Sequence, residues 1–140
     1  MSRSVRLAAG IGLAVSAWLL AIALVAQIVL AGLAVFDAPS WWPRHVAFVH
    51  QFQWLALGVV GFALFSRPPR ATVVAIVITI VLMNTQYTTA ELRLSPRHHA
   101  WAALHPLNGF LLLYAVIEVA RRAARDTLSR LKKGAPPSVV

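Results

Sequence analysis

Four long runs of apolar residues alternate with short polar connections along this chain. The runs cover residues 7–36, 45–65, 71–90 and 100–120. A helix needs about 20 residues to cross the hydrocarbon core of a bilayer, and each run meets that length. Because lipid offers no partner to an open backbone amide, each run is predicted to be a transmembrane helix. The pattern predicts an all-α membrane protein: one four-transmembrane-helix bundle over residues 1–133.

The connections contain the residues that typically end helices. Proline occurs in each of the three stretches 37–43, 66–70 and 94–97. The tail, residues 134–140, contains two adjacent prolines and is predicted to be a disordered cytoplasmic segment. The first apolar run is much longer than the core of a signal peptide, so we expect it to be retained as a helix.

Composition and charge agree with the membrane class and add an orientation. The chain is 59% hydrophobic and 12% charged, whereas soluble domains carry about 25% charged residues. With both termini in the cytoplasm, ten of the 13 basic residues lie inside and three (Arg44, Arg93 and Arg97) lie outside. The inside residues are Arg3, Arg6, Arg67, Arg70, Arg121, Arg122, Arg125, Arg130, Lys132 and Lys133. This bias predicts a multi-pass protein of the cytoplasmic (inner) membrane, and nucleic-acid binding is not expected.

Two similar segments suggest an internal repeat. Residues 27–33 read QIVLAGL and residues 86–92 read QYTTAEL. Each is followed in the next apolar run by a histidine: His50 lies 23 residues after the first glutamine, and His105 lies 19 residues after the second. We therefore predict a bundle of two two-helix units, related by a pseudo-two-fold axis, with one imidazole from each unit facing a shared interior.

The residues around the two histidines point to a cofactor. With no cysteine in the chain, thiolate ligation, iron–sulfur clusters and covalent c-type haem are excluded. Two imidazoles on facing helices suit the axial positions of a b-type haem, so we predict His50 and His105 as the iron ligands. The other expected site residues are polar side chains near the histidines or small residues on the same helix faces. They are Gln27, Gln86, Gln53, Asn108, Gly58 and Gly109.

The sequence is also compatible with other functions. The polar layer could simply lock helix packing in an accessory subunit of a membrane complex or in a homo-oligomer. A membrane enzyme acting on a quinone or haem would use Glu91 as its candidate acid, and electron transfer would require a redox partner. Three further histidines, His45, His98 and His99, fall at the outer helix ends, where they could meet haem propionates, contact a partner, or serve as polar interface residues.

Two short motifs resemble known families. Residues 26–36 (AQIVLAGLAVF) and 104–108 (LHPLN) resemble an uncharacterised family of small four-helix membrane proteins with an LHPxN fourth helix. The layout is also distantly similar to one four-helix half of a haem A synthase, whose units carry a histidine in the second and fourth helices. That resemblance implies haem b binding by His50 and His105. It does not imply catalysis, because a full synthase has two such units.

Overall fold

Every regular element within residues 1–133, the part of the chain that the computed structural model describes, is helical. The elements, in chain order, are α1 (Arg3–Phe36), η1 (Pro39–Trp41), α2 (Trp42–Phe52), α3 (Trp54–Ser66), α4 (Arg70–Glu91), η2 (Leu92–Leu94), η3 (His99–Ala103) and α5 (Leu104–Lys132). The predicted all-α class is therefore confirmed for this part. The predicted disorder of the tail lies outside the described residues.

Four helical segments are long and apolar enough to cross a membrane. They are Arg3–Phe36, Pro39–Ser66, Arg70–Leu94 and His99–Lys132. Each also exposes large hydrophobic side chains on its outer surface, such as Ile22, Leu64, Val74 and Phe110. Large apolar surfaces of this kind are unfavourable in water and favourable against lipid. The segments therefore indicate a multi-pass membrane protein with four spans.

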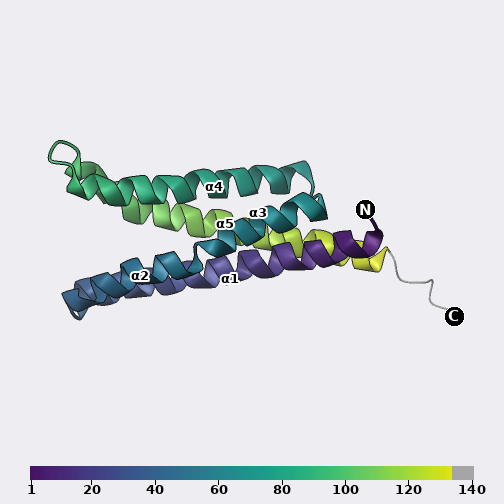
Figure 1. Ribbon diagram of the computed structural model, residues 1–140, viewed down its shortest axis with the longest axis horizontal. Helices are drawn as coiled ribbons and strands as arrows, with labels where there is room; N and C mark the ends of the chain where they lie inside the picture. Colours follow the sequence, from purple (N-terminus) through teal and green to yellow (C-terminus); the bar gives the residue numbers. More distant parts are fainter. Residues whose placement is uncertain (134–140) are drawn as a thin grey trace.

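The helices pack as two pairs that meet along one line. Helix α1 packs along both α3 and α5, and α4 packs along α5. Helix α2 contacts α1 but makes no backbone approach to α4 or α5. As a consequence, α1 and α2 diverge from α4 and α5 toward the connections at residues 37–41 and 92–103 (Figure 1). We call this the connection end. The termini end is the other one, where α1 begins, α5 ends and residues 67–69 join α3 to α4.

Small residues bring α1 close to its neighbours. Ala17 and Leu20 of α1 are fully buried, as are Leu112 and Ala120 of α5. Helix α1 also lies close to α3, since a Cβ added at Gly12 would lie 2.7 Å from the ring of Phe62. Small side chains permit such close packing between membrane helices, which lack a hydrophobic driving force toward one another.

The second span differs from the single predicted helix because it is interrupted at Gln53. Helix α2 ends at Phe52 and α3 begins at Trp54. The Ala56 amide bonds to the Gln53 carbonyl at 3.1 Å, three residues back instead of four. The Gln53 side chain enters the interruption, and its Nε2 donates to the His50 carbonyl at 3.3 Å. A side chain inserted into the backbone ladder is a known cause of helix breaks.

Helix α5 continues well beyond the apolar run that predicted it. The extension is amphipathic. Two ion pairs stabilise it, each joining residues one helical turn apart: Glu118 with Arg122 at 2.7 Å and Asp126 with Arg130 at 2.7 Å. Pairs at this spacing support a helix that no longer contacts lipid on all sides.

Candidate functional site

His105 sits in the first turns of α5 and bonds to α4 through both ring nitrogens. Its Nδ1 lies 3.0 Å from the Gln86 carbonyl and 3.2 Å from Thr89 Oγ1, and its Nε2 lies 3.0 Å from Gln86 Nε2. The side-chain amide nitrogen of Gln86 can only donate. The bonding pattern therefore assigns the hydrogen to Nδ1, which donates to the Gln86 carbonyl, and leaves Nε2 as the acceptor.

Asn108, one turn further along α5, holds the Gln86 side chain in place. Its Nδ2 donates to Gln86 Oε1 and also, at 2.9 Å, to the Leu82 carbonyl. Asn108 is buried, with 6% of its surface exposed. A Cβ added at Gly109 would lie 3.3 Å from Gln86 Nε2, so glycine leaves the space that this amide occupies. The predicted residues His105, Gln86, Asn108 and Gly109 thus form one cluster.

His45, in the first turns of α2, makes a matching contact with α1. Its Nδ1 lies 3.2 Å from the Gln27 carbonyl, and Gln27 Nε2 donates to the His45 carbonyl at 2.8 Å. Within residues 1–133 nothing bonds to His45 Nε2, and Gln27 Oε1 is buried without a partner. The ring packs edge-on against Trp42, with centroids 5.5 Å apart. The result is an oriented imidazole with its second nitrogen open.

The two histidine contacts have the same form. In each, Nδ1 meets the main-chain oxygen of a glutamine on the preceding long helix, at separations of 18 residues for His45 and 19 for His105. Gln27 therefore faces His45, where the sequence had associated it with His50. His50 is exposed in the last turn of α2. Its side chain makes no hydrogen bond within residues 1–133, and its main-chain carbonyl accepts from Gln53 Nε2.

A third contact ties the interrupted second span to α4. The Tyr87 hydroxyl donates to Gln53 Oε1 at 2.8 Å. This bond spans a region where α2 has no backbone contact with α4, and it satisfies the carboxamide that enters the helix break. The sequence selected Gln53 but gave no role to Tyr87 or Thr89, and it placed His45 only among the outer histidines that could meet propionates or a partner. The sequence did offer a way to find His45, because it follows Gln27 by nearly the same number of residues as His105 follows Gln86.

The remaining predicted residues lie elsewhere. Gly58 serves the α1–α3 contact, where a Cβ would lie 3.2 Å from Ser16 Oγ. Glu91 is exposed at the end of α4, without an ion pair in the described part of the chain. His98 and His99 bond locally, to Ser95 Oγ at 3.2 Å and to the Pro96 carbonyl at 3.4 Å. Across residues 1–133 no group of three or more His, Cys, Asp or Glu side chains forms a metal cage.

Comparison with known proteins gives one match. Residues 27–92 match a family of unknown function, DUF6220. The matched stretch runs from Gln27 to Leu92 and so includes both similar segments and His45. It ends before the LHPLN motif at residues 104–108, and it does not bear on the resemblance to haem A synthase, which stays a prediction. No curated protein and no solved structure matches the chain.

Proposed function

We propose that this chain is a b-type haem protein of the membrane, with His45 and His105 as axial ligands and electron transfer as its work. One observation carries the proposal: both histidines direct Nδ1 to the backbone carbonyl of a glutamine on a neighbouring helix, at 3.2 and 3.0 Å. Histidines that bind metals almost always donate their second ring N–H to such an acceptor, which fixes the tautomer and aims the other nitrogen.

The Nε2 atoms of His45 and His105, which would bind the iron, have different hydrogen-bonding surroundings. His45 Nε2 is open, so its lone pair is available without rearrangement. His105 Nε2 accepts from Gln86 Nε2 at 3.0 Å, so ligation requires the Gln86 amide to turn away. Asn108 then keeps the displaced amide near by, because it bonds to Gln86 Oε1 and independently to α4. The two neutral imidazoles would hold the haem, which would supply one-electron transfer.

The proposed haem would lie between the two helix pairs. Helix α2 makes no backbone approach to α4 or α5, so the backbones of the two pairs stay apart around His45. Gln27 Oε1 is a buried acceptor without a partner among residues 1–133, which is costly unless something bound there donates to it. These features support the haem reading more than a layer built only for packing.

The same contacts support the proposed repeat and orientation. Helix α1 with the α2–α3 span would form one unit, and α4 with α5 the other, each contributing one glutamine–histidine pair. With both termini in the cytoplasm, as the distribution of basic residues favours, the histidine layer lies in the outer half of the membrane. A redox partner or a quinone would then be met from that side.

A second candidate function is favoured by a different observation. Around His105, the polar groups of Gln86, Thr89 and Asn108 satisfy one another with nothing bound. Such a network suits a subunit whose polar layer locks helix packing within a larger assembly. The enzymatic alternative gains no support, because Glu91 bonds to none of these side chains.

The colour of the purified protein separates the two candidates. After expression with ample haem, the proposal expects a Soret band that copurifies with the protein and disappears in His45→Ala and in His105→Ala. A protein that stays colourless with haem supplied in excess would overturn the haem proposal and favour the packing role.

A further inference from the structure

The termini end contains a cavity lined mostly by basic residues. Its volume is about 460 Å³. The lining residues come from both termini of the helical bundle and from the α3–α4 connection. They are Met1, Arg3, Arg6, Leu7, Arg67, Arg130 and Lys133. Among residues 1–133 no acidic side chain lines the cavity.

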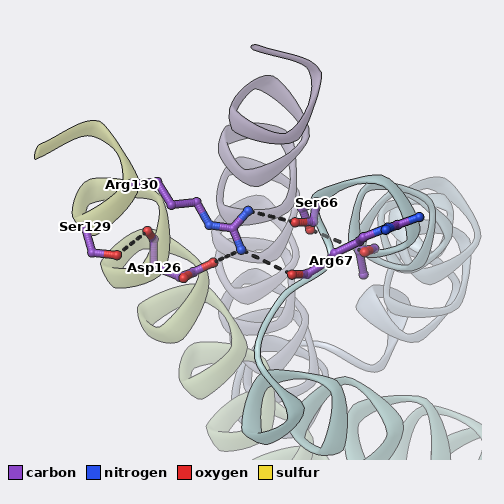
Figure 2. A network of polar contacts seen from close by, with 6 residues as sticks. Ser66, Arg67, Asp126, Ser129 and Arg130 are labelled. Carbon is purple, nitrogen blue, oxygen red and sulfur yellow. Dashed lines mark hydrogen bonds and ion pairs between the residues drawn. The ribbon is translucent and has the colours of Figure 1, made fainter. Parts of the chain in front are cut away.

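Arg130 lines this cavity and links the end of α5 to the end of α3 and, through its main-chain carbonyl, to the start of α1. Figure 2 shows its guanidinium reaching the main-chain oxygens of Ser66 and Arg67, at 2.9 and 3.2 Å, while Asp126 pairs with it at 2.7 Å. These carbonyls belong to the end of α3, where Arg67 adopts a left-handed conformation with φ of 49°. The last carbonyls of a helix lack intrahelical donors, and Arg130 supplies them.

Arg3 performs the corresponding task for α5. Its Nη2 donates at 3.2 Å to the Arg130 carbonyl, in the last turn of α5. The Ser2 hydroxyl caps the start of α1 by accepting from the Val5 amide at 3.3 Å. The beginning of α1 and the ends of α3 and α5 are thus held together around the cavity by defined hydrogen bonds. Arg6 and Lys133, in contrast, make no side-chain hydrogen bond or ion pair with any residue between 1 and 133.

A charge balance shows what the cavity prefers. Five basic residues line it, and within residues 1–133 Asp126 is the only carboxylate paired with them. The C-termini of α3 and α5 add about half a negative charge each. These terms leave about three positive charges, to which the Met1 amino group and the start of α1 add further, so the helix C-termini do not offset the basic lining. Glu118 does not reduce it either, because it pairs with Arg122 at 2.7 Å and lies 3.9 Å from Arg125.

We propose that this cavity binds a phosphate group, carried by the headgroup of an anionic membrane lipid. Guanidinium and ammonium groups are the usual partners of phosphate oxygens. The cavity lies where the apolar part of α1 begins, and Leu7 contributes an apolar wall beside the arginines. A lipid phosphate occupies this boundary between polar and apolar surroundings, whereas a free ion gains nothing from the apolar wall. The proposal is independent of haem binding.

The test uses the full chain in nanodiscs of phosphatidylcholine, with and without phosphatidylglycerol. We expect phosphatidylglycerol to raise Tm and to remain bound in native mass spectrometry. The variant Arg6→Gln/Lys133→Gln should weaken retention about tenfold, which is the effect of about 1.4 kcal/mol of lost interaction. This variant should still fold, because neither side chain makes an internal bond.

The matched control is Arg70→Gln/Arg121→Gln, which removes the same charge from the same end of the bundle. Neither residue lines the cavity, so this variant should retain phosphatidylglycerol as the wild type does. Equal loss in both variants, or loss in neither, would overturn the site. A third arm adds inorganic phosphate to phosphatidylcholine discs, and stabilisation equal to that by phosphatidylglycerol would overturn the assignment to a lipid.

Discussion

The imidazole Nδ1 of His45 lies 3.2 Å from the main-chain oxygen of Gln27. This contact orients a ring that would otherwise rotate freely at the start of α2, and it leaves Nε2 without a hydrogen-bond partner in residues 1–133. An equivalent contact orients His105 on the opposite pair of helices at 3.0 Å from the Gln86 carbonyl. The proposed pair of iron ligands rests on these two contacts having the same geometry.

The two glutamines should respond differently to removal of their amides. Gln86→Leu breaks the bonds to His105 Nε2 and Asn108 Nδ2, so we expect the unfolding free energy of the haem-free protein to fall by about 1 to 2 kcal/mol. Gln27→Leu breaks one bond, to the His45 carbonyl, but also removes a buried oxygen without a partner. Its effect should stay within about 0.5 kcal/mol.

Unfolding in a denaturing-detergent titration measures both variants. Gln86→Leu should also keep the Soret band, since the amide competes for the nitrogen that is proposed to bind iron. Equal destabilisation by the two variants would contradict the hydrogen-bond assignment.

Tyr87→Phe tests the bond between α4 and the interrupted second span. Loss of the bond to Gln53 Oε1 should cost about 0.6 kcal/mol, an average value for hydrogen bonds between membrane helices. Tyr114→Phe is the matched control, because Tyr114 is 72% exposed and forms no hydrogen bond within the described residues. If both substitutions shift Tm by the same amount, the Tyr87 bond contributes nothing.

A pair of glycines tests the packing of α1 against α3. In Gly12→Ala the new methyl group would lie 2.7 Å from the Phe62 ring and force it to move. Overpacking of this kind costs about 1 to 3 kcal/mol, and Phe62 is 41% exposed and free to turn outward, so the lower value is expected. Gly61→Ala meets no atom within 4 Å and should instead stabilise its helix by up to about 1 kcal/mol. Opposite signs of the Tm shift check the interface, and a loss from Gly61→Ala would contradict it.

Much of the fold followed from the sequence because membrane helices are determined by length and hydropathy. All four spans were predicted, and so was the cluster of His105, Gln86 and Asn108, since polar side chains in an apolar run must find one another. The break at Gln53 could not be predicted. No proline or glycine marks it, and it depends on Tyr87, which is distant in sequence.

The sequence associated Gln27 with His50, whereas Gln27 bonds to His45, and the reason is geometric. His45 and His50 are five residues apart, which places them about 140° from each other around a helix, so only one of them can face α1. The carboxamide three positions after His50 suggested that residue, by analogy with His105 and Asn108. The spacing from the glutamine was the better indicator, because it reflects the length of the connection between the two helices.

The absorption spectrum of histidine variants tests the central claim most directly. His45→Ala, His50→Ala and His105→Ala would be purified after expression with the same haem supplement, and the Soret absorbance would be compared per mole of protein. We expect His50→Ala to keep the band of the wild type, and His45→Ala and His105→Ala to lose the six-coordinate spectrum. A band that persists in His45→Ala but disappears in His50→Ala, or a wild-type protein with no band, would contradict the account.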